Sequence, residues 1–301
     1  MSKNTVSKRT VHCLAFEPKH LKDALALSRQ AQWPHRLEDW SLTLALSQGL
    51  VAVDAEAPEG AQVVGTVLMT PYGEDAATIN MVIVDEGWRG QGLGRRLMDE
   101  AMALAGDRPL RLVATTDGLP LYEKLGFREV GTVLQHQGEA SPMSVVAAED
   151  VAPAGTDDRA AIAALDRQAF GADRSRLLER FAEIGSFTLL RRNGVPVGFA
   201  ALRDFGRGQV IGPVVAPDAD GAKALIGPII AANAGKFLRV DTTADTGLGP
   251  WLADCGLRHV GGGIAMRRPA PTASAPASTT ISAPASAAPV STFALASQAL
   301  G

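Results

Sequence analysis

The segment INMVIVDEGWRGQGLGRRLM, residues 79–98, decides the fold that the rest of the chain is expected to adopt. Its first residues are mostly apolar and β-branched, which predicts a strand buried on both faces. The next three residues, Asp85 to Gly87, predict a turn. From Leu93 onward, apolar residues recur at helical spacing. The segment therefore predicts a strand, a glycine-rich turn and the start of an amphipathic helix.

The glycine-rich turn, Arg89-Gly90-Gln91-Gly92-Leu93-Gly94, indicates a site for an anion. A helix N-terminus offers free N–H groups and the positive end of the helix dipole, and glycines let a phosphate approach the backbone. Arg89 and Arg95 add positive charge. The turn lacks the Gly-Lys-Ser/Thr of a P-loop, and its glycines do not follow the dinucleotide pattern G-x-G-x-x-G. The alternative interpretation is a turn that only caps the helix.

Two motifs resemble those of the GNAT superfamily of acetyl-CoA-dependent N-acetyltransferases. The spacing Arg-x-x-Gly-x-Gly, from Arg89 to Gly94, is similar to the loop that binds the acetyl-CoA pyrophosphate in that family. The sequence LYEKLGF, residues 121–127, resembles the second GNAT signature, Tyr-x-x-x-Gly-Phe, on a late helix and the strand after it. A strand predicted at residues 110–114 lies between the two motifs, which is the order that the family shows.

The predicted order of elements occurs twice in the chain. Strand, two helices, three strands, helix, strand, helix and strand are predicted within residues 1–140, and again within residues 144–269. Val84 then aligns with Val215, and Gly126 with Gly256. The fold class is therefore expected to be α/β (α+β), with two tandem GNAT-like domains, each a mixed, mostly antiparallel sheet flanked by helices. Residues 270–301 are rich in Ala, Pro, Ser and Thr and carry no charge, which predicts a disordered tail.

The second copy is expected to have lost its chemistry. The aligned positions replace the loop and the tyrosine as follows: Asp220 for Arg89, Lys223 for Gly92, Leu225 for Gly94 and Leu252 for Tyr122. An aspartate repels a pyrophosphate, and side chains block the close approach that glycines allow. The arrangement resembles bacterial tandem GNAT proteins with a degenerate C-terminal domain. We expect residues 1–140 to catalyse and residues 144–269 to support them.

The resemblance implies a role for each matching residue. Tyr122 is the expected catalytic residue, a general acid that protonates the departing thiolate of coenzyme A. A bulge near Val82 and Val84 is expected to free backbone N–H groups for the thioester and pantetheine. The expected cofactor-binding residues are Val82, Val84, Arg89, Gly90, Gln91, Gly92, Gly94 and Arg95. Many relatives carry an asparagine upstream of the tyrosine, and this chain has Thr116-Asp117-Gly118-Leu119-Pro120 there instead.

An acceptor pocket is predicted between the first two helices. Trp33, His35, Asp39 and Trp40 bring aromatic, titratable and acidic groups together, a set that suits a cation with an apolar part. The alternative is that Trp40 belongs to the core and that Asp39 faces the dipole at a helix start. Asn80 and Thr115, near strand ends, are weaker acceptor candidates. No residue is assigned as the general base.

Composition and charge indicate which partners the protein is expected to lack. The net charge of −3 and scattered basic residues do not indicate nucleic-acid binding. The two cysteines, Cys13 and Cys255, match no metal or redox spacing, so no metal is expected. No apolar run approaches the ~18 residues of a membrane span. A cytoplasmic protein, monomeric or homodimeric, with no membrane partner is therefore expected.

The function predicted from these features is transfer of an acetyl group from acetyl-CoA to the primary amine of a small molecule, by direct attack on the thioester. A first alternative is a non-catalytic sensor that binds acyl-CoA, with an effector or partner bound by the second copy. A second alternative is acetylation of protein lysines. The sequence leaves open the identity of the acceptor and the length of the acyl group.

Overall fold

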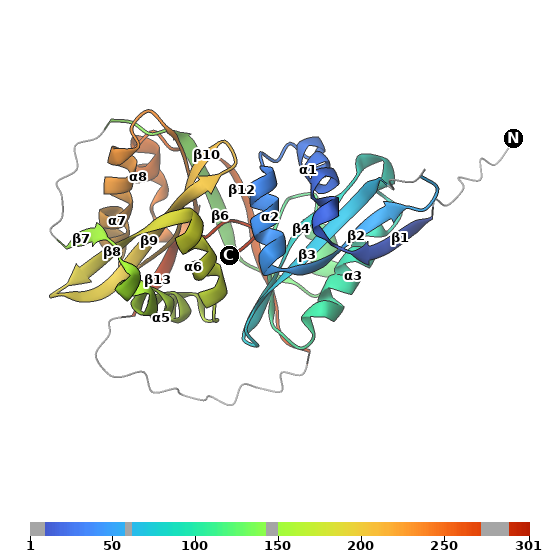
Figure 1. The fold of residues 1–301 in the computed structure, drawn as a ribbon, viewed down its shortest axis with the longest axis horizontal. Helices are drawn as coiled ribbons and strands as arrows, with labels where there is room; N and C mark the ends of the chain where they lie inside the picture. Colours follow the sequence, from blue (N-terminus) through green and yellow to red (C-terminus); the bar gives the residue numbers. More distant parts are fainter. Residues whose placement is uncertain (1–9, 58–61, 143–149, 272–288) are drawn as a thin grey trace, which may run out of the picture. The chain divides into compact units, whose positions relative to one another are not determined.

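A computed structural model describes residues 10–57, 62–142, 150–271 and 289–301. The chain forms two compact units (Figure 1). The first unit holds residues 1–70 and 79–106, and the second holds residues 71–78 and 107–301. Both units combine strands and helices.

The observed elements follow the predicted order in both copies. The first copy contains β1 (Val11–Ala15), α1 (Leu21–Gln30), α2 (Leu37–Leu46), β2 (Gln48–Asp54), β3 (Val63–Tyr72), β4 (Ala76–Val84), α3 (Leu93–Ala105), β5 (Leu110–Ala114), α4 (Leu119–Lys124) and β6 (Arg128–Glu139). The second copy contains β7 (Val151–Pro153), α5 (Arg159–Phe170), α6 (Ser175–Ile184), β8 (Gly185–Arg192), β9 (Val195–Phe205), β10 (Gly208–Ala216), α7 (Ala219–Ala232), β11 (Phe237–Thr243), α8 (Gly249–Asp254) and β12 (Arg258–Arg268). The predicted α/β fold, with the same order of elements in two copies, is confirmed.

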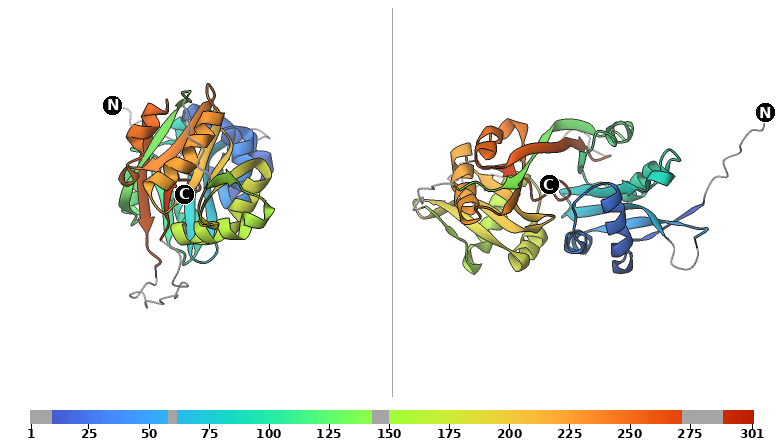
Figure 2. Two further views of the ribbon diagram at one scale, coloured as in Figure 1. Left: turned by 90° about the vertical axis from the view of Figure 1, so that its left-hand side faces the viewer. Right: turned by 90° about the horizontal axis from the view of Figure 1, so that it is seen from above.

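The first unit is a sheet in the order β1-β2-β3-β4 with helices on both faces. Helices α1 and α2 cover one face, and α3 covers the other (Figure 2). The apolar stripe of α3 is buried, as its helical spacing predicted: Leu93, Leu97, Met98, Ala101 and Ala105. Strand β3 is buried on both faces from Val63 to Thr70, which explains its nearly continuous apolar sequence.

The last strands of the two copies are exchanged in the second unit. Strand β12 of the second copy pairs with β5 of the first copy, from Ile264↔Ala114 to Arg268↔Leu110. Strand β6 of the first copy pairs with β11 of the second copy, and β6 and β12 also pair with each other. The two long strands run side by side (Figure 1). The compact units therefore differ from the sequence copies, and the boundary predicted between residues 140 and 144 stays a prediction about sequence.

The end of the chain differs from the predicted tail. Residues 272–288 lie outside the described residues, but residues 291–294 form a further strand, β13, that pairs with β10. Val290, Ala294, Ala296 and Leu300 are buried. The expectation of disorder is therefore wrong for residues 289–301. These residues carry enough apolar side chains to offset the entropy of ordering a short segment.

Candidate active site

The glycine-rich turn leaves open backbone at the N-terminus of α3. Gly90 and Gly92 have φ of 74° and 82°, left-handed conformations that residues with side chains rarely adopt. A Cβ atom at either position would meet no described atom within 4 Å. Gly92 is the N-cap of α3, and the first turn of the helix holds no acidic residue. The backbone N–H groups can therefore meet an anion at the positive end of the dipole.

Three arginines lie around this turn. Arg89 donates from Nε to the carbonyl oxygen of Val84 at 3.2 Å, which holds its side chain against the end of β4. Arg95 pairs with Asp99 at 3.0 Å, one helical turn further on. Arg96, which the motif comparison did not single out, donates to the carbonyl oxygen of Val11 at 3.3 Å. All three side chains are exposed, so they keep a positive field over the open backbone.

A cavity of about 330 Å³ adjoins the turn. Its walls come from β1, from the short turn before α3 and from the first helical turn, and the lining residues are Thr10, Val11, Trp88, Gln91, Gly92, Leu93 and Arg96. The cavity thus brings together the predicted Gln91 and Gly92 with the unpredicted Arg96. A space bounded by open backbone and an arginine fits the phosphates of a nucleotide-bearing substrate.

Strand β4 is irregular just before the residues predicted to bind the thioester. Met81 has a φ of 51° in the middle of the strand, a left-handed conformation that interrupts regular strand geometry. Its carbonyl oxygen accepts a hydrogen bond of 2.7 Å from the Thr66 hydroxyl, which holds the irregular backbone in place. Val82 and Val84 follow it and are half-buried. The irregularity lies one residue before the stretch where the bulge was predicted.

Tyr122 lies on α4 in the second unit and is 8% exposed. Burial raises the pKa of its phenol to about 12, so the group stays protonated over the physiological range. Its ring lies 6.2 Å from that of Phe127, in an edge-to-face arrangement. A Cβ atom at Gly118 would lie 2.8 Å from the ring, so the glycine makes room for it. A protonated phenol is the form that a general acid requires.

The aromatic residues predicted as an acceptor pocket are packed against one another. Trp40 is 0% exposed and donates from its indole nitrogen to Ser28 Oγ at 2.9 Å. His35 Nδ1 lies 3.1 Å from the same oxygen, and its ring lies 5.6 Å from that of Trp33. Asp39 is buried, accepts from the Arg36 backbone at 2.8 Å and pairs with its guanidinium. Trp40 and Asp39 therefore match the alternative interpretation, as a core residue and a helix-start acid.

The two weaker acceptor candidates also have local partners. Asn80 is buried and donates to Thr70 Oγ1 at 2.9 Å, and Thr70 in turn contacts the Ser47 hydroxyl at 2.6 Å. Thr115 is exposed and caps the turn before α4, because its Oγ1 accepts from the Gly118 backbone at 3.3 Å. Thr115 thus lies beside the glycine that accommodates Tyr122, whereas Asn80 is part of a polar chain inside the first unit.

In the second copy, a carboxylate of the chain itself takes the anion position at the helix N-terminus. Asp218 is the N-cap of α7 and accepts from the Gly221 backbone at 2.7 Å. Arg192 pairs with the same carboxylate at 3.0 Å. These two contacts lower the pKa of the Asp218 carboxyl, and the hydrogen bond from the backbone N–H contributes more than the arginine. Asp220, which aligns with Arg89, lies in the first turn of the same helix and pairs with Lys223 at 3.8 Å.

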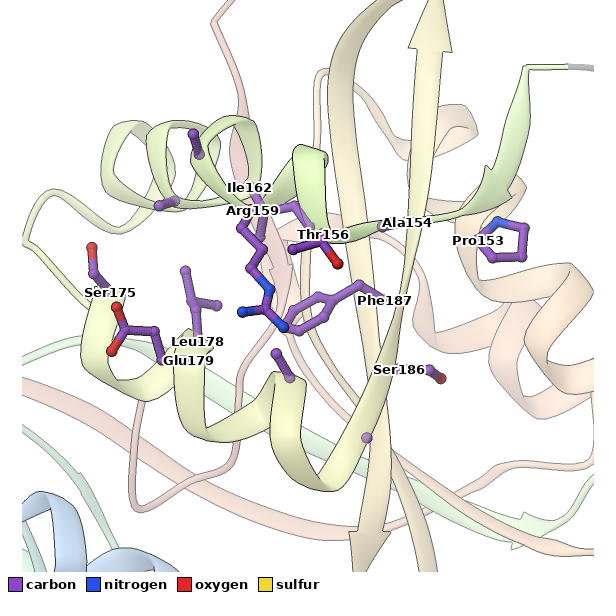
Figure 3. A pocket seen from close by; sticks show the side chains of 15 residues that line it. Pro153, Ala154, Thr156, Arg159, Ile162, Ser175, Leu178, Glu179, Ser186 and Phe187 are labelled. Atoms are coloured by element: carbon purple, nitrogen blue, oxygen red, sulfur yellow. The ribbon is translucent and has the colours of Figure 1, made fainter.

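A cavity of about 600 Å³ lies between α5, α6 and β8 of the second copy (Figure 3). Helices α1 and α5 begin at residues 21 and 159, and α2 and α6 at residues 37 and 175, a constant spacing of 138. At that spacing, Phe16 and Trp40 correspond to Ala154 and Leu178. The Phe16 and Trp40 rings contact each other at 5.7 Å in the first copy. Their smaller counterparts leave the space that the aromatic pair fills.

Two known protein-family models match the chain, and one of them spans the glycine-rich turn. Two models of the GNAT acetyltransferase domain match the chain, one at residues 47–129 and the other at residues 162–281. Together they cover more than half of the chain, which belongs to the GNAT acetyltransferase family. An uncharacterised N-acetyltransferase of Bacillus subtilis, YitH, is 28% identical over 236 residues, which are 77% of this chain and 82% of that protein.

Solved structures show the same double fold. A candidate acetyltransferase from Pyrococcus horikoshii superposes with a TM-score of 0.76 at 17% identity, and covers 100% of this chain and 99% of its own. A tandem GNAT protein from the clavulanic acid biosynthesis pathway has a TM-score of 0.62 at 13% identity, over 86% of this chain and 98% of its own. At these identities the likeness describes the fold alone.

Two further features concern the membrane and metals. Among them, no helix has both the length and the apolar character needed to cross a membrane. Nor do three His, Cys, Asp or Glu side chains in the described ranges gather where they could hold a metal ion.

Proposed function

We propose that the protein transfers the acetyl group of acetyl-CoA to the primary amine of a small molecule. The observation that carries the proposal is the open backbone at Gly90 and Gly92, at the N-terminus of α3 and beside exposed arginines. The family supports acetyl transfer as the reaction class. Gly90, Gly92, Gly94 and the adjoining arginines would hold the diphosphate, with Gln91 and Arg96 lining the cavity next to it.

In the proposed reaction the amine nitrogen attacks the thioester carbonyl carbon, so that a C–N bond forms as the C–S bond breaks. The amine loses a proton to a base or to water, and the thiolate gains one. The family resemblance assigns the donation of that proton to Tyr122. A phenol with a pKa of about 12 is protonated when the reaction begins, which supports this role. The acceptor, a cytoplasmic location and a monomeric or homodimeric state belong to the same proposal.

Calorimetric titration of acetyl-CoA into the wild type and into Gly92→Asp tests the proposed site. The added carboxylate would lie at the helix N-terminus, where it competes with the diphosphate, so we expect one equivalent to bind to the wild type and none to the variant. Gly247→Asp is a matched control, because Gly247 also has a left-handed φ, 69°, and open space around it. Unchanged binding to Gly92→Asp, or no binding to the wild type, would refute the assignment of the site.

The sensor alternative has one observation in its favour, the cavity between α5 and α6. Its floor is apolar, from Ile162, Leu178 and Phe187, and Arg159 reaches across it toward the phenylalanine ring (Figure 3). A space of about 600 Å³ can hold a small effector. Leu178→Trp would fill the cavity with the residue that the first copy has at that position. If the second copy senses an effector, the variant should lose ligand-induced thermal stabilisation across a metabolite panel and keep acetyl-CoA binding.

A further inference from the structure

The central strand of the second copy parts from its parallel neighbour after two residue pairs. Strands β10 and β11 pair at Gln209↔Leu238 and Val210↔Arg239 only. In the first copy, β4 and β5 pair at Ala77↔Leu110 and Thr78↔Arg111 only. In the second copy, β11 therefore does not pair with the residues that follow on β10. A free strand edge requires other hydrogen-bonding partners.

In the second copy, residues 291–295 lie along this edge. Strand β13 pairs antiparallel with β10 at Val214↔Ala294, Val215↔Thr292 and Ala216↔Ser291. On its other side, the Leu295 backbone donates to the Asp241 carbonyl oxygen of β11 at 2.8 Å. Thr242 Oγ1 donates to the Phe293 carbonyl oxygen at 2.7 Å. The segment is thus hydrogen-bonded to both strands that have parted.

The groove that holds the segment is shaped for a backbone rather than for large side chains. A Cβ atom at Gly212 of β10 would lie 1.9 Å from the Leu295 carbonyl oxygen, so only glycine allows this approach. Ala294 and Ala296 are 1% and 0% exposed. At these two positions the segment has small side chains, and larger ones there would displace the strand.

Polar groups of the second unit hold the end of the segment. Arg203 donates to the Ala296 carbonyl oxygen at 3.1 Å. The Tyr72 hydroxyl donates to the Leu300 carbonyl oxygen at 2.6 Å. Arg174 donates to the Gly301 backbone oxygen at 2.6 Å, and its guanidinium lies 3.8 Å from the centre of the Phe170 ring. These donors are buried, so removing the segment would take one acceptor from each of them.

We propose that the gap between β10 and β11 is a peptide-binding groove, filled in cis by residues 289–301, along the stretch of central strand that aligns with Val82 and Val84. That alignment links the proposal to the proposed function, in which the matching stretch of β4 binds the acyl-CoA. The groove takes an extended peptide by strand addition, with small residues at the positions of Ala294 and Ala296. The second copy has thus exchanged its cofactor for a segment of its own chain.

In the test, the full chain folds before the segment is cut from it. A protease recognition sequence is placed within residues 272–288, the full-length protein is purified, and the chain is then cut. We expect the fragment containing residues 289–301 to remain bound through gel filtration. An excess of synthetic peptide 289–301 should displace it, whereas the same peptide with Ala294→Asp should not, because a buried carboxylate would have no partner.

Two variants of the cut protein test whether the close approach at Gly212 holds the fragment. Gly212→Ala should release the fragment at least ten times faster, whereas Gly131→Ala, at a strand glycine with open space around it, should not. Immediate loss of the fragment from the otherwise native protein, or equal competition by the Ala294→Asp peptide, would overturn the proposal. A second equivalent of acetyl-CoA bound after removal of the fragment would also overturn it. Fragment retention does not depend on acetyl-CoA, so failure of the proposed function would leave this result readable.

Discussion

Removing the carboxylate of Asp166 should be among the most destabilising single changes in the second unit. Asp166 on α5 and Arg174 at the start of α6 are both 0% exposed in their side chains. They form a bidentate pair, with Arg174 Nη2 at 2.6 Å from Oδ1 and Nε at 2.9 Å from Oδ2. Asp166→Ala would leave a buried guanidinium with no counter-charge, which costs roughly 3–5 kcal/mol.

The expected loss of stability is large because the guanidinium left behind is buried, not because the ion pair itself is strong. For a unit of this size, 1 kcal/mol shifts the unfolding midpoint by roughly 2–4 °C, so a shift of roughly 6–20 °C is expected. The pair of Arg180 and Glu183 is a matched control, because both side chains are about half exposed. Glu183→Ala should cost about 1 kcal/mol or less. Replacing both buried partners, as Asp166→Leu with Arg174→Met, should recover most of the loss.

Thermal and urea unfolding, followed by circular dichroism, measure these differences. The reasoning would be refuted if Asp166→Ala cost no more than Glu183→Ala. It would also be refuted if the double replacement were as unstable as the single one, because the loss would then reflect packing of α5 against α6. Arg174 also donates to Gly301, so Asp166→Ala should loosen the terminal segment and speed its release in the cut protein.

Three other outcomes are expected. Tyr122→Phe should lower kcat by roughly 10²–10⁴ and leave acetyl-CoA binding unchanged, as measured by thiol release with an amine panel and by calorimetry. Burial raises the pKa of both tyrosines, Tyr72 and Tyr122, to about 12, so tyrosinate absorbance should appear near that pH in the native protein and about 10 in the denatured one. Because the folded pKa values are the higher ones, this contribution to stability is fully present below about pH 10 and is lost as the pH rises through about 12. Trp40→Ala should lower the free energy of unfolding in urea by roughly 3–5 kcal/mol, whereas Trp33→Ala, at a half-buried position, should lower it less. If Trp40→Ala changed only the KM for the amine, the acceptor interpretation would be favoured instead.

The order of elements could be predicted because each depends on local sequence. The apolar run before Asp85, the glycines after Arg89 and the helical spacing from Leu93 each act within a few residues of themselves. The positive φ of Gly90 and Gly92 follows from the same local logic. The turn that begins the helix was therefore located correctly from sequence, together with the flanking strand.

The features that sequence missed depend on distant partners. Most apolar residues in 270–301 are alanines and large apolar side chains are few, but Val290 and Leu300 are buried in the second unit. Nothing local indicates that β12 pairs with β5 rather than beside its own penultimate strand. Trp40 was ambiguous for a related reason, because a tryptophan near a predicted loop suits both a pocket and a core. Its contacts with Phe16 and Ser28 place it in the core.

The strand exchange explains why a copy that has lost its loop would keep its fold. Strand β5 leads into α4, which carries Tyr122, and the neighbour of β5 on its far side is β12 of the second copy. Strand β6 finds its partners in β11 and β12, both from the second copy. Without the second copy, β5 and β6 would present unpaired edges, which favour aggregation. A change that unfolds β12 should therefore also leave β5, which leads into the helix that carries Tyr122, without its neighbour. The N-terminus of α7, capped by Asp218, takes no part in this pairing.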